Sequence, residues 1–353
     1  MSGFTDKQDV LLKQALTGLK ADETAQAFSQ AVDRFKRNLL NQQKQFPYAQ
    51  AFGEYSKLTR TGGFDTEALI KAADSLSIAD LVQLKTATFA QNDLRVFSYG
   101  NYNQQDIDAI AEELSATLPS NHKRSEFARS KAWLPQPGET LVLQKDIDVA
   151  DVAVVDMTVH PVAGYRQKAE AAVLQSHFRT VAFDKMRTEE QLAYAVGALA
   201  RPIEGYSAIG LYIQTPVKGP KEIQARFDKF KKEYAVELDN MSEETFEQLK
   251  NSTLVSLKEQ PKNLSDEMSP LINDWYRENF TFDSKQKLID EVEKVTLADI
   301  KGYYKQTMLN PNAARLNVQL RGTKFIESDF ADLPNQTKIT TLDAYYNGIK
   351  LQK

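Results

Sequence analysis

Ser77-Ile78-Ala79-Asp80-Leu81 is similar in residue types to a second stretch, Thr296-Leu297-Ala298-Asp299-Ile300. The second stretch begins 219 positions later (296 − 77) in a chain of 353 residues. Each version places a hydroxyl residue three positions before an aspartate, which is the pattern of a capping box at a helix start. Each is followed at a nearly equal distance by a strand-like run, Leu94–Tyr99 in the first copy and Arg315–Arg321 in the second. A repeat of this length predicts two copies of one domain rather than a solenoid, whose units are far shorter.

The second copy has a full set of predicted elements. Strand-like runs at Thr140–Leu143 and Val152–Val159 precede a helix expected from about Tyr165 to Phe178. Leu192–Leu199 and Tyr206–Gln214 are rich in Tyr, Val, Ile and Ala, and the short gap between them contains Pro and Gly. These two runs are therefore predicted to form a β-hairpin.

Pro220 is predicted to open a helix with an apolar inner face, because apolar residues recur there at spacings of three and four. A cluster of lysines lies on the same segment, at Lys229, Lys231 and Lys232, and a solvated helix face is the favoured interpretation of it. Further helices are expected up to Met308. The residues of the predicted inner face are Ile223, Phe227, Phe230, Tyr234 and Leu238.

The first copy is predicted to be mainly helical and incomplete. Shifting the opening strands of the second copy back by the repeat distance places their counterparts before residue 1, so we expect the chain to begin inside a domain. The stretch 119–139 contains three prolines and no sustained period, which is typical of a linker. The predicted organisation is a truncated domain at 1–118, a linker at 119–139 and a complete domain at 140–353.

The bulk composition excludes several classes of function. The net charge is −4 and the chain contains no cysteine. Nucleic-acid binding needs a basic face that releases counterions from phosphates, and this balance does not indicate one. Without cysteine there are no disulfides, thiolate nucleophiles or thiolate metal sites. No apolar window of about 18 residues is present, so a membrane span is not predicted.

The three histidines, His122, His160 and His177, do not form a zinc-binding motif. Two metal ligands normally converge from a short helical spacing. Neither H-E-x-x-H nor H-x-x-E-H occurs in the chain. We therefore predict no metal site in this chain. A Ser-His-Asp triad stays open because its members can lie far apart in sequence, although the G-x-S-x-G elbow is absent.

The segment Phe183–Tyr194 (FDKMRTEEQLAY) is the most informative for function. Thr188 and Gln191 can form a capping box, which predicts one helical turn before a strand that starts near Tyr194. This turn can place the Arg187 guanidinium beside the Tyr194 hydroxyl at the end of a sheet. Two such donors could hold a peptide carbonyl or a developing oxyanion. On chemistry alone, a buried tyrosine and a surface arginine with ordinary partners is the favoured interpretation.

A family resemblance reverses that preference. The run Met186–Val196 (MRTEEQLAYAV) resembles the L-R-T-x-E-Q-L-G-Y signature of the C-terminal half of the insulysin/pitrilysin (inverzincin) zinc metallopeptidases, nearest to their pitrilysin branch. Phe282-Asp283-Ser284, the helix at Thr296, the final strand and Phe97–Asn101 also fall where that family has them. Ala193 is a departure, because the family usually has glycine there.

The resemblance implies an α+β fold of duplicated insulysin/mitochondrial-processing-peptidase-like metallohydrolase domains. Each would be a mostly antiparallel sheet with helices packed on it. Residues 1–118 would be the C-terminal part of the third family domain, and residues 140–353 the complete fourth domain. The zinc would be bound through H-x-x-E-H in the N-terminal half, so this chain alone is expected to be inactive and to bind no cofactor.

By the same resemblance, the chain would be the non-catalytic half of a zinc metalloendopeptidase. Its partners would be the N-terminal catalytic half and peptide substrates, with no nucleic acid and no membrane. Arg187 would hold the substrate backbone and Tyr194 would donate to the oxyanion. The alternative is a stand-alone peptide-binding or scaffold protein without hydrolytic activity. By analogy with pitrilysin-like members the periplasm is the favoured location, with the cytoplasm as the alternative.

Overall fold

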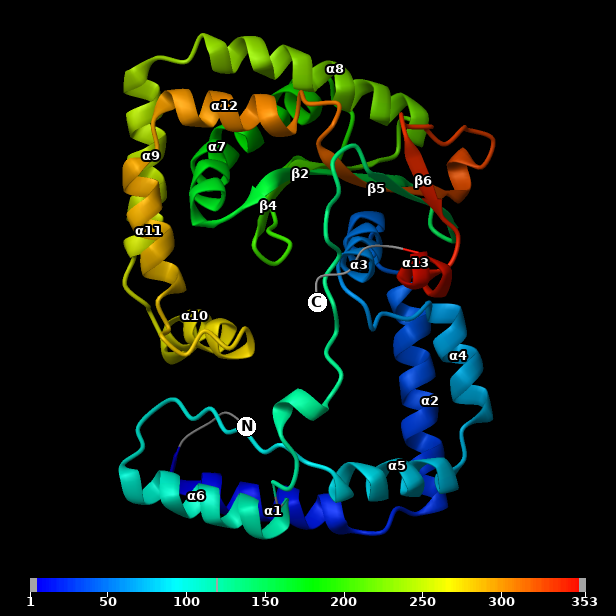
Figure 1. Ribbon diagram of the computed structural model, residues 1–353. Coiled ribbons are helices and arrows are strands. Elements are labelled where there is room, and N and C mark those ends of the chain that lie inside the picture. Colours follow the sequence, from blue (N-terminus) through cyan, green and yellow to red (C-terminus); the bar gives the residue numbers. More distant parts are fainter. Residues whose placement is uncertain (1–4, 119, 349–353) are drawn as a thin grey trace. The chain divides into compact units, whose positions relative to one another are not determined.

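The computed structural model describes residues 5–118 and 120–348, which form two compact units (Figure 1). The first, called the helical unit below, comprises Met1–Leu39, Thr66–Arg129 and Pro261–Phe282. The second, called the sheet unit, comprises Leu40–Asp65, Ser130–Gln260 and Asp283–Lys353. The assignment of 1–118, 119–139 and 140–353 to family domains and a linker stays a prediction.

The regular elements of the helical unit are helices throughout its described part. The capping box at Ser77 is confirmed: the Ser77 N–H donates to Asp80 Oδ2 at 2.8 Å, and the Asp80 N–H donates to Ser77 Oγ at 3.3 Å. The longer helices are α1 (Gln8–Lys20), most of α2 (Ala25–Gln42), α4 (Thr66–Ser75), α5 (Ile78–Ala90), α6 (Gln104–Thr117) and α10 (Leu264–Tyr276).

The predicted strand at Leu94–Tyr99 is wrong. A strand needs a partner for its main-chain groups, and the described part of the helical unit contains no strand to pair with it. The Leu94 N–H instead donates to Ser120 Oγ at 3.1 Å. The same motif that leads into a strand in the second copy therefore leads into an irregular segment here.

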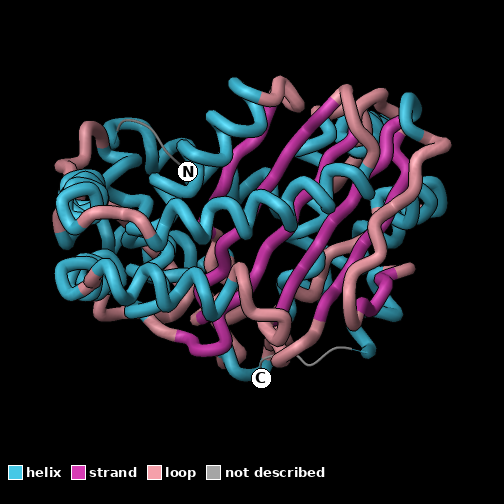
Figure 2. Tube along the Cα trace, turned by 90° about the horizontal axis from the view of Figure 1, so that it is seen from above, coloured by secondary structure: helices cyan, strands magenta, loops and turns pink. Residues whose placement is uncertain are grey.

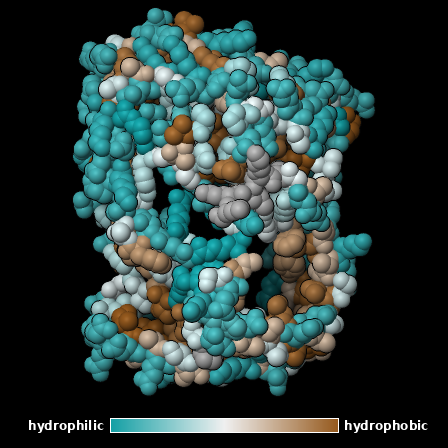
Figure 3. Space-filling view, in the orientation of Figure 1, coloured by the Kyte–Doolittle hydropathy of each residue, from teal (hydrophilic) through white to brown (hydrophobic). Residues whose placement is uncertain are grey.

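Apolar side chains are exposed on two helices of the helical unit, and Figure 3 shows hydrophobic patches over this part of the molecule. The apolar side of α2 is also only partly buried, since Leu39 is buried but Phe35 is exposed. The described part of this unit contains no sheet against which its amphipathic helices could bury their apolar sides. The exposed residues on α1 and α5 are Val10, Leu11, Leu19, Val82 and Leu84.

The sheet unit is built on six strands in the order β3-β4-β2-β5-β1-β6 (Figure 2). β2 is antiparallel to β4 and β5, and β3 is antiparallel to β4, whereas β1 is parallel to β5 and β6. The predicted strands and hairpin are confirmed, as is the α+β fold with a mostly antiparallel sheet. The strands are β1 (Thr140–Ile147), β2 (Val152–Ala163), β3 (Ala195–Ala200), β4 (Tyr206–Thr215), β5 (Ala314–Gly322) and β6 (Gln336–Ile339).

Helices cover both faces of this sheet. Val152 and Val154 of β2 belong to the core under α7, α8 and α12, while Ala153, Val155 and Met157 belong to the core under α3. A strand buried on both faces needs apolar residues at nearly every position, which explains the continuous run in β2. The helices are α3 (Pro47–Thr59), α7 (Tyr165–Phe183), α8 (Pro220–Asp239), α9 (Glu243–Lys258), α11 (Ser284–Lys294), α12 (Leu297–Thr307) and α13 (Leu342–Gly348).

The second capping box is also confirmed. The Thr296 N–H donates to Asp299 Oδ2 at 2.8 Å, and the Asp299 N–H donates to Thr296 Oγ1 at 3.3 Å. The helix that it starts, α12, buries Ile300, Tyr303 and Tyr304 in the core. In the first copy, α5 has the same start and no buried residue. The predicted inner face of α8 is buried at all five positions.

Candidate functional site

The segment Phe183–Tyr194 joins α7 to the edge strand β3. Instead of ending, α7 continues as a π-helical turn over Asp184–Glu189, a conformation that is frequent at functional sites. The chain then turns at Gln191, whose φ is 51°, and the Leu192 N–H donates to Met186 O at 2.9 Å. The predicted capping box at Thr188 is wrong, because a cap residue must be non-helical and Thr188 lies inside this turn.

Arg187 reaches the main chain at the start of β3. Its Nη1 atom donates to Ala193 O at 3.2 Å and also to Tyr194 O, while its Cζ atom lies 5.4 Å from the centre of the Phe183 ring. Both hydrogen bonds are donated by Nη1. The other two guanidinium nitrogens, Nη2 and Nε, donate to no acceptor among the described residues. The exposed guanidinium therefore keeps donors for a ligand.

Tyr194 is 69% exposed and stands directly before β3. Arg187 and Tyr194 are thus brought together through the Tyr194 carbonyl; no contact between Arg187 and the Tyr194 hydroxyl occurs among the described residues. Ala193 replaces the glycine of the family signature without strain, because the left-handed backbone position in this turn is Gln191.

Two contacts anchor the turn to the sheet unit. Glu190 accepts two parallel hydrogen bonds from Arg226 of α8, at 2.8 Å from Nε and 2.6 Å from Nη2. These bonds hold the pKa of the Glu190 carboxyl below its usual range. On the other side, the buried Thr215 hydroxyl of β4 donates to Leu192 O. The chain immediately before Tyr194 is therefore fixed at two points.

A second cluster was not predicted from sequence, and it corrects the interpretation of Lys231 as part of a solvated helix face. Lys231 is buried, and its Nζ atom lies 2.6 Å from Oδ2 of the fully buried Asp156. Arg315 binds the same carboxylate through Nε at 2.6 Å and Nη2 at 2.7 Å. Burial opposes ionisation of Asp156, but the charges of Arg315 and Lys231 outweigh it and hold the pKa of Asp156 well below its usual range.

Two sequence signals could have revealed this cluster. Asp156 is the single charge inside the apolar run at 152–159, where it cannot be solvated. Lys231 follows Phe227 by four positions and precedes Tyr234 by three, so it lies on the inner face of α8 rather than the outer one. A buried carboxylate and a buried lysine are expected to pair, because an unpaired buried charge is very costly.

The described residues contain no group of three or more His, Asp or Glu side chains placed to bind a metal ion. His160 Nε2 lies 2.9 Å from Gln306 Oε1, its Nδ1 accepts from the Val162 N–H at 3.1 Å, and its ring stacks on Tyr303. His177 Nδ1 lies 2.9 Å from the Tyr234 hydroxyl. Burial lowers the pKa of both imidazoles. Within the described residues, no helix has the length and hydropathy to cross a membrane.

Comparison with known proteins finds two family matches in separate parts of the chain. Residues 1–72 match the family described as the middle or third domain of peptidase M16. Residues 173–272 match the family described as PQQ synthase PqqF-like, C-terminal lobe domain 4. Protease 3 of Salmonella typhi is 23% identical over 328 residues, which cover 92% of this chain and 34% of that protein. The chain therefore spans about a third of the length of the curated relatives it matches.

Solved structures show the same fold. The crystal structure of pitrilysin matches with a TM-score of 0.88 and 20% identity, over 99% of this chain and 37% of that one. A structure described as a peptidase M16 inactive domain, from Pseudomonas fluorescens, matches with a TM-score of 0.61 and 15% identity, over 90% of this chain and 76% of that one. The predicted family resemblance is confirmed by these findings together.

Proposed function

Because the chain is related to the C-terminal half of the insulysin/pitrilysin (M16) peptidases, we propose that it is the non-catalytic half of a zinc metalloendopeptidase. In this proposal the chain encloses a peptide and positions it against an N-terminal half, which carries the zinc and the catalytic residues. The finer roles of the chain's own residues, its peptide partners and a periplasmic location belong to the same proposal.

The observation that carries the proposal is the arrangement of Arg187. Its Nη1 atom is held by the carbonyls of Ala193 and Tyr194, which fixes the guanidinium at the end of the sheet. The remaining donors are free to bind the carbonyl oxygens of a peptide lying along this edge. A donor that is already oriented needs no reorganisation when charge develops on the substrate.

Tyr194 supplies the second proposed donor. Its ring is exposed, while the chain is anchored before it at Leu192 and after it by the pairing of Ala195 with Gln214. The hydroxyl can therefore be presented to a bound peptide with little further loss of conformational entropy. In the proposal this hydroxyl donates to the oxyanion that forms when a peptide carbonyl is attacked. Closure of a second half over the site would exclude water and strengthen both donors.

Zinc, which the family implies, does not fit the described residues of this chain, because they contain no set of His, Asp or Glu side chains that could hold it. The ligands would have to come from the N-terminal half. The proposed contribution of this chain is therefore limited to binding, orientation and exclusion of water.

The test is reconstitution. The chain alone, supplied with zinc, is expected to leave a quenched fluorescent peptide intact, and addition of a matching N-terminal half is expected to start cleavage. Zinc-dependent cleavage by the chain alone would refute the proposed division of labour. If the chain binds the peptide tightly in fluorescence anisotropy but never supports cleavage with any N-terminal half, the alternative of a peptide-binding protein replaces the proposal.

A further inference from the structure

A pocket, called the second pocket below to distinguish it from the Arg187–Tyr194 site, lies at the other end of the sheet from Arg187. The strand register places Ala195 of β3 beside Gln214, and Gln214 beside Ala153 of β2. Thr158, which lines the second pocket, lies five residues further along β2 and pairs with Arg315. Five residues of strand span roughly 16 Å, so the two sites are separate.

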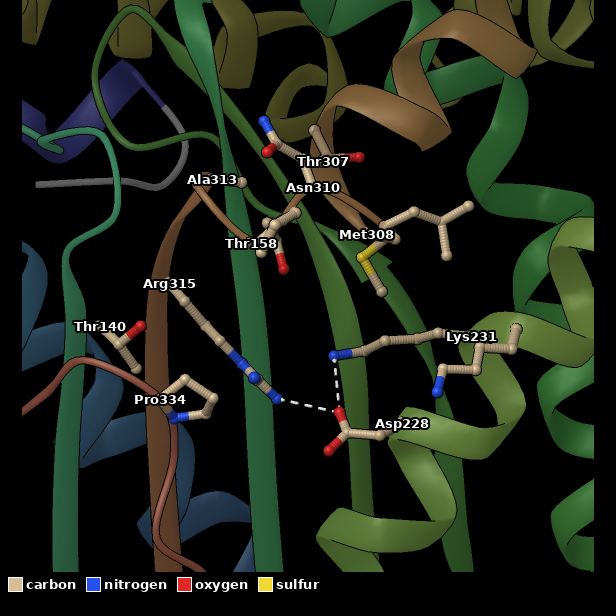
Figure 4. Close-up of a pocket in the computed structure, with 13 residues that line it drawn as sticks. Thr140, Thr158, Asp228, Lys231, Thr307, Met308, Asn310, Ala313, Arg315 and Pro334 are labelled. Carbon is tan, nitrogen blue, oxygen red and sulfur yellow. Dashed lines mark hydrogen bonds and ion pairs between the residues drawn. The ribbon is translucent and has the colours of Figure 1, made fainter.

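This pocket has a volume of about 410 Å³, which is within the usual range of small-molecule sites. Figure 4 shows its polar side: Thr158 and Arg315 come from neighbouring strands, while Lys231 and Asp228 come from α8. The opposite wall is mostly apolar, with Asn310 as a polar member, and comes from the chain after α12 and from the segment before β6. Its apolar residues are Met308, Leu309, Pro311, Ala313 and Pro334.

The pocket carries an excess of positive charge. Three cations line it, Arg315, Lys231 and Lys232. Two carboxylates face them: Asp228 in the lining and Asp156 beneath it, where it binds both Arg315 and Lys231. Lys232 is exposed and makes no ion pair within the described part of the chain. One positive charge is therefore left without a partner, which suits a ligand with a single negative charge.

The Asp228 carboxylate already lies where such a ligand would bind, but its contacts with the two cations are long. Its Oδ1 atom lies 3.3 Å from Arg315 Nη2 and 3.5 Å from Lys231 Nζ, compared with 2.6 Å for the closest contacts of Asp156. The same Asp228 atom accepts a hydrogen bond from Gln224 Nε2 at 3.1 Å. The Asp228 side chain is also 48% exposed. An incoming carboxylate can displace it toward solvent and take over both cations, because these two contacts of Asp228 are long and its own side chain is half-exposed.

Two threonines of the lining offer further polar groups to a ligand. Thr140 and Thr158 line the pocket, both are more than nine-tenths buried, and neither hydroxyl makes a hydrogen bond with any described residue. Neither hydroxyl oxygen is among the buried side-chain atoms that lack a partner in the described residues, so both stay accessible from the pocket and can donate to a ligand oxygen. Such donors, next to a guanidinium and an ammonium, match the oxygens of a carboxylate.

We propose that this pocket binds a small monocarboxylate with an apolar substituent, the carboxylate lying on Arg315 and Lys231 and the substituent on the wall around Met308. The carboxylate can belong to a free aliphatic acid or to the C-terminal residue of a peptide, since both present the same group. This site does not depend on the proposed peptidase role, because none of its residues takes part in that role.

The test is isothermal titration of the full 353-residue chain with two acids and their neutral amides. The probes are hexanoate and hexanamide for a free acid, and N-acetyl-Ala-Leu and its C-terminal amide for a peptide end. A dissociation constant on the order of 1 mM is expected for an acid of this size, with no detectable binding of the amides. Binding of hexanoate alone identifies a free-acid site, and binding of the dipeptide alone identifies a C-terminus site. Equal binding of acid and amide, or no binding of either acid, overturns the proposal.

Variants distinguish binding in this pocket from a nonspecific effect of the charge of the chain. Lys232→Gln is expected to weaken acid binding about threefold, since it removes one charge from the rim. Lys229→Gln, on the same helix and exposed outside the pocket, is the matched control and should change nothing. Asp228→Asn is expected to tighten binding about fivefold, because it removes the competing carboxylate. Equal effects of the two lysine changes, or weaker binding by Asp228→Asn, would also overturn the proposal. Circular dichroism of each variant confirms that it is folded.

Discussion

Nζ of Lys231 lies 2.6 Å from Oδ2 of Asp156, so α8 and the central strand β2 are joined by an ion pair between two buried side chains. The Asp156 carboxylate also accepts hydrogen bonds from Asn317 Nδ2 at 3.1 Å and from Arg315. Buried charges of this kind are tolerated only when their hydrogen-bonding capacity is nearly filled. This cluster holds one helix layer to the sheet, and it also forms the floor of the second pocket.

Replacing Asp156 by asparagine should strongly destabilise the sheet unit. The change leaves Lys231 and Arg315 buried without their shared carboxylate, and breaking a buried pair in this way costs about 3–5 kcal/mol. Urea denaturation followed by circular dichroism measures the loss. Asp239→Asn is the control, because that aspartate lies at the exposed end of α8 and should be replaced with almost no effect. Equal stability of the two variants would mean that the buried pair contributes nothing.

The contribution of Asp156 should also depend on pH. Its pKa in the folded state is lowered, so its stabilising effect is fully present above the unfolded pKa and is lost as the pH falls below it. The unfolded value is about 3.9. The difference in free energy of unfolding between the natural chain and Asp156→Asn should therefore be constant above about pH 5 and shrink below about pH 4. A difference that grows on acidification would contradict this sign.

The buried His160 and the partly buried His177 should weaken the fold at mildly acidic pH. Burial lowers the pKa of His160 and His177 in the folded state, so the unfolded chain binds protons more readily as the pH falls below about 6.5. The free energy of unfolding is expected to decline between about pH 7 and pH 5, and the decline should flatten in the double variant His160→Asn, His177→Asn. His122→Asn serves as the control for loss of a histidine. If stability falls with pH just as steeply in the double variant, groups other than these two histidines cause the acid sensitivity.

Equivalent positions of the repeat should respond differently to truncation. Leu84 of α5 and Tyr303 of α12 occupy the same place relative to their capping boxes, but Leu84 is 65% exposed and Tyr303 is fully buried. Tyr303→Ala should cost about 3–5 kcal/mol, as expected for removal of a buried ring, while Leu84→Ala should cost less than about 0.5 kcal/mol. Thermal denaturation of the two variants gives the comparison. A large loss in Leu84→Ala would show that its apolar face is covered within this chain.

Removal of the proposed donors should lower activity without lowering stability. In the enzyme reconstituted with an N-terminal half, Arg187→Gln and Tyr194→Phe are each expected to reduce kcat about 100-fold, the usual effect of losing an oxyanion donor. Tyr276→Phe is the control for Tyr194→Phe, since its ring is similarly exposed at 70%. Normal kcat in both donor variants would remove the basis for the proposed role, and a fall in melting temperature would point to a structural one.

The features predicted well from sequence are those that depend on neighbouring residues. The capping boxes at Ser77 and Thr296 close over three positions, and the β3–β4 hairpin closes over a short Pro- and Gly-containing gap, so both follow from local chemistry. The inner face of α8 follows from helical spacing alone. Arg187 and Tyr194 could likewise be named from a short motif, although their catalytic roles stay a prediction.

What the tertiary structure decided depends on partners that are distant along the chain. Leu94–Tyr99 has a strand-like sequence but no strand beside it in the described residues, and a ladder of hydrogen bonds cannot form on one side alone. Thr188 has the sequence of a cap, yet α7 continues through it because Met186 and Leu192 are anchored in the core. Lys231 belongs to a lysine-rich segment, but its environment is set by Asp156, 75 residues earlier. Local hydrogen bonds depend on residues that are close together in the sequence. Burial and charge pairing arise only after folding has brought remote residues together.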